Sequence, residues 1–352
     1  MALALPRKEG DNNDLLRVMW MLFTFFSFYA PKFIYIIFSL LARLPRLWHH
    51  RDIKWLRVGG AILGVVIFFA MWWGALINRY DIQVREVTIE IPDLPQALDG
   101  YTIAQFSDLH TGTFGTDTAF TSKLVDHINS LEADMIVFTG DIVNRKTDEI
   151  KPHTAPLSRL HARDGVISIL GNHDYGDYYA WPDDNAKRAN LSQLIDINRE
   201  MGWNMLNNAS HTIHAANDSS AMLSIIGVEN IGDYPFPVYG DLDQAMNGVD
   251  DKSVKILLTH NPAHWVNDIA GHDIDIPLTM SGHTHAMQIE VAGLSPAVFR
   301  YPTWGGLYTD KSNPDKHLYV NIGAGTVGFP MRIGATPEIT LFTLRAKPHS
   351  EL

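Results

Sequence analysis

Positions 135–141 read Met-Ile-Val-Phe-Thr-Gly-Asp, an apolar run followed at once by a glycine and a carboxylate. Consecutive apolar residues that include valine and isoleucine are typical of a strand covered on both faces. The glycine allows the backbone to turn and to approach another segment closely. The pattern predicts a buried strand ending just before Asp141, at the edge of a sheet where ligands usually bind.

The same arrangement of an apolar run followed by acidic, amide or imidazole side chains occurs four more times. These places are Asp108-Leu109-His110, Gly171-Asn172-His173-Asp174, His260-Asn261-Pro262 and Gly282-His283-Thr284-His285. Further predicted strands are 102–107, 166–170, 222–227, 254–259, 277–281 and 317–322, and the predicted helices are 119–130 and 186–201. We therefore predict an α/β (α+β) domain over residues 87–352, with its polar clusters at strand ends.

Composition excludes several kinds of site. The 352 residues include no cysteine, which rules out disulfides, thiolate metal sites and cysteine nucleophiles. Residues 1–86 hold 11 Lys and Arg against 6 Asp and Glu, whereas the remainder holds 17 against 33. Because nucleic-acid binding needs basic patches, this acidic remainder predicts no nucleic-acid partner.

Residues 1–86 are predicted to be a membrane region. Residues 58–77 form an uncharged apolar run of 20, which at ~1.5 Å per residue spans the ~30 Å of a bilayer's hydrocarbon core. Residues 18–44 are comparably apolar but contain Pro31 and Lys32, so this segment either spans as well, forming a hairpin, or lies in the interface.

The basic residues between the two apolar segments predict the orientation. They are Arg43, Arg46, Arg51, Lys54 and Arg57. Positive charge collects on the cytoplasmic side of membranes, which places this loop in the cytoplasm and residues 87–352 outside, whether the protein is multi-pass or single-pass.

The polar clusters have the chemistry of a two-metal site. Asp108 and His110 are two residues apart, which lets both side chains face one way in extended chain, and a carboxylate with an imidazole suits Zn, Mn or Fe. Taken alone, such a pair is more often a polar turn. Asp141 is our choice for a carboxylate that bridges two cations. Asn172 is predicted to be a neutral oxygen ligand, and the adjacent His173 the acid that protonates the leaving group.

The remaining predicted ligands are His260, His283 and His285, the last two again spaced by two residues. Asp174 is expected to support its turn and not the chemistry. The other histidines follow no comparable pattern and are interpreted as surface or core residues.

Together the five motifs, in this order, resemble the calcineurin-like metallophosphoesterase family. The resemblance covers about residues 101–344. Its C-terminal part includes Tyr319-Val320-Asn321, Gly323, Gly325, Pro330-Met331-Arg332 and Pro337-Glu338-Ile339, similar to a membrane-anchored bacterial branch with UDP-2,3-diacylglucosamine pyrophosphatase-like members.

The resemblance implies two mixed β-sheets flanked by helices and two divalent metal ions, Mn, Fe or Zn. It implies a first metal held by Asp108, His110, Asp141 and His285, a second held by Asp141, Asn172, His260 and His283, and His173 as catalytic imidazole. Two departures stand out. Asn144-Arg145 replaces an Asp-Arg pair, although Asn144 could accept a hydrogen bond and Arg145 could reach a phosphate. Ala286-Met287-Gln288 replaces Gly-Gly-Gln, which is expected to narrow or reshape substrate access.

The predicted function is hydrolysis of a phosphodiester or pyrophosphate bond, in a small molecule or a lipid-linked substrate, by a hydroxide that the two metals activate. One alternative is hydrolysis of UDP-2,3-diacylglucosamine in lipid A synthesis, whose substrate would lie on the cytoplasmic side, against the predicted orientation. Another is a metal-binding membrane scaffold without turnover. The predicted location is the bacterial inner membrane, with the catalytic domain outside the cytoplasm. The sequence does not predict the oligomeric state.

Overall fold

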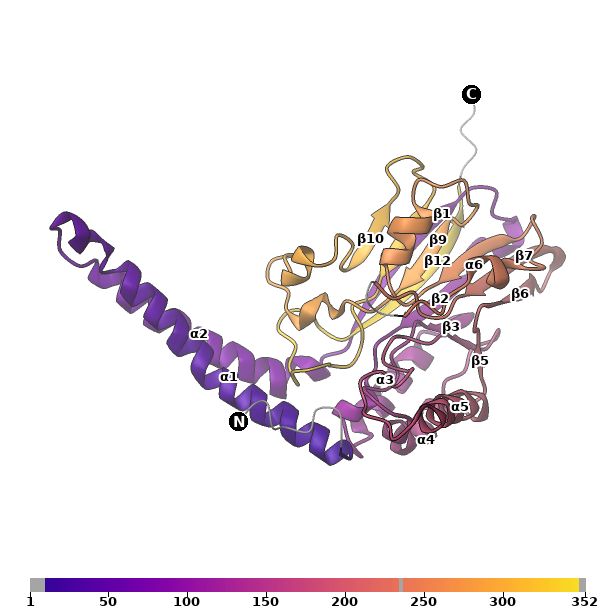
Figure 1. Ribbon diagram of the computed structural model, residues 1–352. Coiled ribbons are helices and arrows are strands. Elements are labelled where there is room, and N and C mark those ends of the chain that lie inside the picture. The colour runs from indigo at the N-terminus through magenta and orange to yellow at the C-terminus, as the bar shows by residue number, and fades with distance from the viewer. Residues whose placement is uncertain (1–9, 234–236, 348–352) are drawn as a thin grey trace, which may run out of the picture.

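The computed structural model describes residues 10–233 and 237–347. Two long helices, α1 (Asn12–Leu41) and α2 (Lys54–Leu76), form an antiparallel hairpin that projects from a domain built on two β-sheets (Figure 1). The other α-helices are α3 (Ala119–Ser130), α4 (Thr154–Leu157), α5 (Asp184–Glu200) and α6 (Leu242–Met246).

The first sheet has six strands in the order β1-β12-β2-β3-β4-β5. Their bounds are β1 Gln83–Ile91, β12 Glu338–Ala346, β2 Thr102–Phe106, β3 Met135–Phe138, β4 Val166–Ser168 and β5 Trp203–Met205. All neighbours are parallel except β12 and β2, which are antiparallel. The carboxyl ends of β2, β3 and β4 therefore lie along one edge.

The second sheet is also mixed and has the order β10-β11-β9-β8-β7-β6. Its strands are β10 Gly306–Thr309, β11 His317–Val320, β9 Leu278–Ser281, β8 Val254–Leu258, β7 Asp218–Gly227 and β6 Ala209–Ala215. The four strands from β11 to β7 are parallel, and an antiparallel strand lies at each edge.

The core lies between the two sheets and on their outer faces. Side chains of β2, β3 and β12 meet side chains of β7, β8 and β9 in one buried cluster that includes Ile103, Val137, Ile256 and Phe342. Alternate residues of β3, such as Ile136, point the other way and pack under α3 and α5. The second sheet is covered on its outer face by α6 and the segment Trp265–Ile269. The predicted pair of mixed sheets flanked by helices is confirmed.

The predicted elements are found, with small differences at their ends. Helix α3 has the predicted bounds, and each of the predicted strands overlaps an observed strand, although β7 begins at Asp218, before the predicted strand 222–227. Strands β1, β5, β6, β10 and β12 were not predicted. Charged residues Arg85, Glu86 and Glu90 interrupt the pattern of β1, and β5 is only 3 residues long. The division of the chain after residue 86 stays a prediction, and β1 begins at Gln83.

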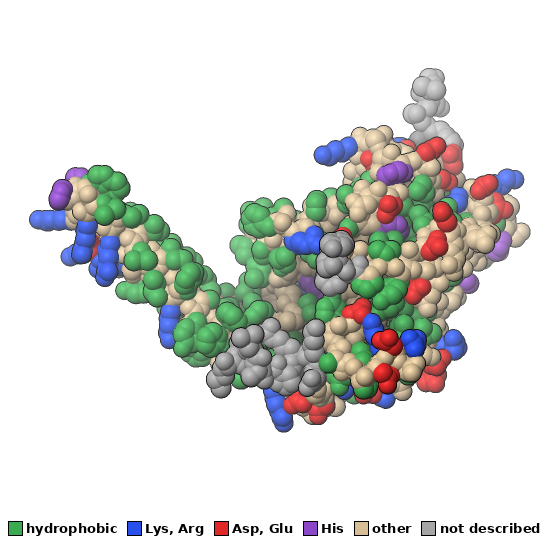
Figure 2. Space-filling view, in the orientation of Figure 1, with side chains coloured by type: hydrophobic (Ala, Val, Ile, Leu, Met, Phe, Trp, Pro, Cys, Tyr) green, Lys and Arg blue, Asp and Glu red, His purple; other side chains and the backbone are tan. Residues whose placement is uncertain are grey.

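Both helices of the hairpin are long and apolar enough to cross a membrane, by length and composition. Helix α1 continues through Pro31, against whose carbonyl the α2 residue Gly64 packs: a Cβ on Gly64 would lie 3.0 Å from that oxygen. The basic residues between the helices are at the far tip of the hairpin, away from the domain (Figure 2). There Asp52 pairs with Arg46 and Arg57.

We predict that Phe342→Ala lowers the stability of the protein strongly. Phe342 is 0% exposed between the sheets, and deleting a buried phenyl ring costs roughly 3–5 kcal/mol. The matched control is Phe299→Ala, since Phe299 is 92% exposed. Thermal unfolding in detergent, followed by circular dichroism, should show a lower midpoint for the first variant only. Equal midpoints would contradict this description of the core.

Candidate metal centre

The predicted ligands lie at one edge of the domain because the strands that precede them end there. Strands β2 and β3 of the first sheet lead to Asp108 and Asp141, and β8 and β9 of the second lead to His260 and His283. Buried Gln105 ties the sheets together near this edge, since its Nε2 donates to Thr139 Oγ1 at 3.0 Å and to the Ser281 carbonyl at 2.9 Å.

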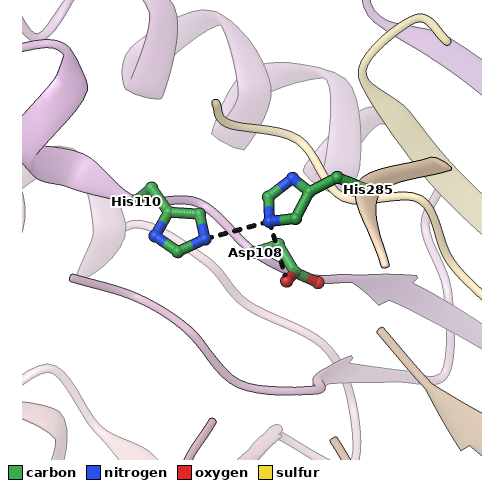
Figure 3. A group of neighbouring side chains, drawn as sticks. All are labelled: Asp108, His110 and His285. Carbon is green, nitrogen blue, oxygen red and sulfur yellow. Dashed lines mark hydrogen bonds and ion pairs between the residues drawn. The ribbon is translucent and has the colours of Figure 1, made fainter. Parts of the chain in front are cut away.

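One group of side chains consists of Asp108, His110 and His285 (Figure 3). His285 Nε2 lies 3.2 Å from Asp108 Oδ1 and 3.0 Å from His110 Nε2. Asp141 Oδ2 lies 3.6 Å from His110 Nε2. Three or four potential ligand atoms therefore point toward a common space.

The second group is built around the same carboxylate, Asp141. His260 Nε2 lies 3.2 Å from Asp141 Oδ2 and 3.1 Å from Asn172 Oδ1. His283 Nδ1 is 3.2 Å from His260 Nε2. Asp141 Oδ2 thus lies between His110 of the first group and His260 of the second, which is the position that a bridging carboxylate requires.

The donor set fits divalent cations. Two ligand atoms that are each about 2.1 Å from one cation lie a little over 3 Å apart in tetrahedral geometry, as these ring nitrogens do. His110 Nδ1 and His260 Nδ1 donate to the carbonyls of Val143 and Thr139 at 3.1 and 2.8 Å, so that each Nε2 is the nitrogen that faces the centre. Carboxylate, amide and imidazole ligands are a mixture suited to Mn, Fe or Zn.

Burial makes the charges in this cluster depend on one another. Burial opposes ionisation of Asp141, but His260 and its neighbours hold the pKa of this carboxyl well below its ordinary value. Burial likewise disfavours a charged His260, yet Asp141 raises its pKa to about 10. Burial, together with His260, lowers the pKa of His283 to about 3. A cation must therefore displace the proton of His260, so acid should weaken metal binding.

The backbone at these ligands is strained. Asp108, His110, Asp141, His283 and His285 all have positive φ, between 46° and 78°. For residues with a side chain this left-handed conformation costs roughly 1–2 kcal/mol, and such strain clusters at functional sites. The spacing of two residues was expected to turn both side chains of each Asp-X-His or His-X-His pair to one face by strand alternation. That reason was wrong, because these residues follow the strands and lie in sharp turns.

Asp174 supports the turn, as expected. Its Oδ2 accepts from the backbone N–H of Asp141 at 2.9 Å and of Gly171 at 2.8 Å, and its Oδ1 accepts from Ile142 and Val143 at 2.9 and 3.2 Å. Gly171 is needed for this packing, since a Cβ there would lie 2.2 Å from Asp141 Oδ1. One buried carboxylate thereby fixes the loop that carries Asp141.

His173 lies beside the cluster and is half-buried. Its Nδ1 donates to the backbone carbonyl of Asn144 at 2.6 Å, and its ring stacks on Tyr178 with centroids 4.1 Å apart. The side chain of Asn144 does not make this bond. The hydrogen bond to His173 that was expected of Asn144 thus comes from a main-chain atom, which an asparagine provides as well as an aspartate.

Arg145 has structural partners. Its Nε lies 3.5 Å from Glu149 Oε1, and its Nη2 donates to the carbonyl of Asp11, the residue that caps α1, at 2.9 Å. The guanidinium therefore connects the start of the first hairpin helix with the loop that follows Asp141. Its predicted contact with a phosphate stays a prediction.

Further residues that contact the ligands were missed, among them Tyr178, whose Oη accepts from Asn172 Nδ2 at 2.8 Å. Tyr301 Oη lies 3.3 Å from His283 Nε2, and the fully buried Arg332 places Nη2 3.3 Å from His285 Nδ1. Arg332 lies in the C-terminal signature, whereas nothing in the sequence around Tyr301 marks it. A pocket of about 200 Å³ opens beside His283, Asn172 and Tyr301. A larger cavity of about 440 Å³, which includes Lys255 and Asp275, contains none of the candidate ligands.

The segment Ala286-Met287-Gln288 keeps a backbone that glycine would adopt more easily. Its φ values are 50°, 48° and 60°. Ala286 is fully buried and Met287 is 42% exposed, and neither lines the pocket beside His283. The larger side chains therefore add backbone strain next to His285 without lining this pocket.

Comparison with known proteins is consistent with this site. Residues 101–287 match the family described as Calcineurin-like phosphoesterase, and residues 2–79 match a family described as Probable Calcineurin-like phosphoesterase, transmembrane domain. The second match and the two apolar helices indicate a membrane protein.

Individual relatives carry similar descriptions. The uncharacterized metallophosphoesterase YkuE of Bacillus subtilis is 32% identical over 277 residues, 77% of this chain and 88% of that protein. The transmembrane protein with metallophosphoesterase domain of Danio rerio is 28% identical over 75% of this chain but only 57% of its own length. The solved NAD nucleotidase of Haemophilus influenzae, 14% identical, covers 64% of this chain and 50% of its own, with a TM-score of 0.41, too low to support any argument.

We predict that Asp174→Asn weakens metal binding about 10–100-fold, the usual cost of losing a residue that supports a ligand. The amide would point a donor at backbone N–H groups that now donate to an oxygen. The control is Asp177→Asn in the same loop, where the carboxylate pairs with Lys187. Titration of Mn²⁺ by calorimetry should separate the two variants. Equal affinities would show that Asp174 does not hold the Asp141 loop.

Proposed function

Because the chain belongs to the calcineurin-like phosphoesterase family, we propose that it is a membrane-anchored, two-metal enzyme that hydrolyses a phosphodiester or pyrophosphate bond. The observation that carries the proposal is the position of Asp141, whose carboxylate lies within 3.2–3.6 Å of imidazoles from both ligand groups. His173 forms a third group of potential ligands with His110 and Asp141, and we assign it to the leaving group because its Nδ1 is already bound to the Asn144 carbonyl.

The proposed ligand sets follow the two groups. One ion would be held by Asp108, His110, Asp141 and His285, and the other by Asp141, Asn172, His260 and His283. Bound there, two divalent cations would supply Lewis acidity, which activates water and neutralises charge on phosphoryl oxygens. Mn, Fe and Zn all suit these ligands.

His173 is proposed to protonate the leaving oxygen. Its Nδ1 is held by the Asn144 carbonyl, and Tyr178 fixes the plane of the ring by stacking. Nε2 is thus the nitrogen left to exchange a proton with the substrate. The backbone N–H of His173 also donates to Asp141 Oδ1 at 2.8 Å, which couples the position of the acid to the bridging carboxylate.

The pocket beside His283 is proposed to hold the rest of the substrate. Asn230, Asn261, Arg300 and Tyr301 line it and offer amide, guanidinium and hydroxyl groups. Such groups recognise phosphate and polar headgroups. The membrane hairpin supports a lipid-linked substrate, because it keeps this pocket near a bilayer. Hydrolysis of UDP-2,3-diacylglucosamine remains an alternative from resemblance alone.

The retained His173 and the complete ligand set favour catalysis over a metal-binding scaffold. We predict that His173→Asn lowers kcat for bis(p-nitrophenyl) phosphate with Mn²⁺ by about 10²–10⁴-fold, the usual contribution of a positioned acid, while Mn²⁺ binding is retained. Asn144→Ala keeps the backbone carbonyl and should leave kcat nearly unchanged. Steady-state kinetics of the two variants in parallel would refute the assignment if both lost activity equally or neither did.

We propose that the hairpin lies in a bacterial inner membrane and that the catalytic domain lies outside the cytoplasm. The basic far tip of the hairpin supports this orientation. An alkaline phosphatase fused to the C-terminus should then be active in intact cells, because this reporter works only outside the cytoplasm. A green fluorescent protein at the same position should stay dark. An inactive phosphatase fusion together with a fluorescent green fluorescent protein fusion would show the opposite orientation.

A further inference from the structure

An exposed apolar surface lies on the loop segment between His285 and Tyr301. Its members, here called the apolar rim, are Met287, Val291, Leu294, Val298 and Phe299, with exposed fractions of 42%, 63%, 75%, 51% and 92%. Figure 2 shows hydrophobic side chains gathered on the domain beside the base of the hairpin. Contiguous exposed apolar side chains of this kind mark interaction surfaces.

The apolar rim is continuous with the hairpin. Ile289, within the same segment, packs with Met331 and Ile333 against Phe23 of α1 and Met71 of α2. The backbone of Glu290 and Gln288 pairs with Ile333 at 2.7 and 2.8 Å, so the rim segment is fastened to the loop that touches the helices. The apolar surface of the membrane helices thus extends onto the domain.

The domain contacts the hairpin at a level that lies within the apolar run of α2. Phe329 contacts Phe26 of α1, with ring centroids 5.6 Å apart. Two other α1 residues show which part of α2 lies at this level. Phe23, which precedes Phe26, contacts Trp72 of α2, and Phe28, which follows it, contacts Phe68 of α2. Phe26 is therefore level with residues 68–72 of α2. The apolar run of α2 ends at Ile77, roughly 10 Å further along the helix axis, because each residue adds about 1.5 Å.

The same segment also lines the pocket. Phe299 ends the short helix η10 (Pro296–Phe299), and the next residues, Arg300 and Tyr301, are part of the pocket wall beside His283. Arg300 pairs with Asp233 at 2.8 Å and remains 54% exposed at its side chain. One turn of chain therefore carries an apolar side chain outward and polar side chains toward the candidate metal centre.

We propose that the apolar rim lies in the headgroup and upper acyl region of the bilayer that holds the hairpin, so that the pocket beside His283 opens at the membrane surface. The inference deepens the proposed function, on which it rests, because it places the substrate's phosphate among lipid headgroups. Transfer of exposed Phe and Leu side chains from water into the bilayer lowers the free energy. The hairpin holds these side chains beside the bilayer at high effective concentration. Arg300 would then face anionic headgroups.

The absence of cysteine from the sequence allows a direct test. The full chain carrying Phe299→Cys or Val291→Cys is labelled with an environment-sensitive nitrobenzoxadiazole dye and reconstituted into vesicles of phosphatidylethanolamine and phosphatidylglycerol. Ser219→Cys, at the exposed start of β7 and away from the hairpin, is the control. Labels at 299 and 291 should emit at shorter wavelength, be quenched by doxyl-labelled lipid and be shielded from iodide, whereas the control label should not.

Equal emission and equal iodide quenching at 299, 291 and 219 would overturn the inference. Shielding from iodide without quenching by doxyl lipid would also overturn it, because protein and not lipid would then cover the rim. Because Phe299 is so exposed, its replacement should not disturb folding, and thermal unfolding of each variant checks this. Hydrolysis of bis(p-nitrophenyl) phosphate is measured separately, so loss of the proposed function and failure of membrane contact are distinguished.

Discussion

The structure of the site depends on the buried carboxylate of Asp141 and its shared position between two sets of imidazoles. A buried carboxylate without compensation is costly, so histidines gather around it at 3.2–3.6 Å. The imidazole nitrogens in turn lie close to one another, at 3.0–3.2 Å, an arrangement that a cation between them would stabilise. Five of the ligands have left-handed backbone, a strain that persists only because the surrounding contacts hold these residues in place.

The fold supplies these positions by ending parallel strands of two sheets at one edge, and the membrane hairpin is attached to the same place. Arg332 connects the two: its backbone N–H donates to the Gly74 carbonyl of α2, its carbonyl accepts from Asn78, and its guanidinium reaches His285. At the other side Arg145 holds the residue that caps α1. The hairpin is thus packed against the candidate metal centre and is more than a tether.

Sequence patterns predict the central strands well, because buried strands such as β3 and β8 are continuous apolar runs followed by polar ligands. They predict edge strands poorly, since β1 mixes charged and apolar residues and is recognisable only beside β12. The motifs and their spacing were sufficient to predict all the proposed ligands, but they did not predict the left-handed backbone at those ligands. Tyr301 and the carbonyl of Asn144 could not be predicted, because their roles come from tertiary contacts.

The most direct test of the central claim is a crystal structure of the full chain grown with Mn²⁺, with data collected at the manganese absorption edge. The account predicts two anomalous peaks per chain, about 3.5–4 Å apart as in two-metal hydrolases, with the Asp141 carboxylate bound to both. A single peak, or peaks away from Asp141, would contradict it.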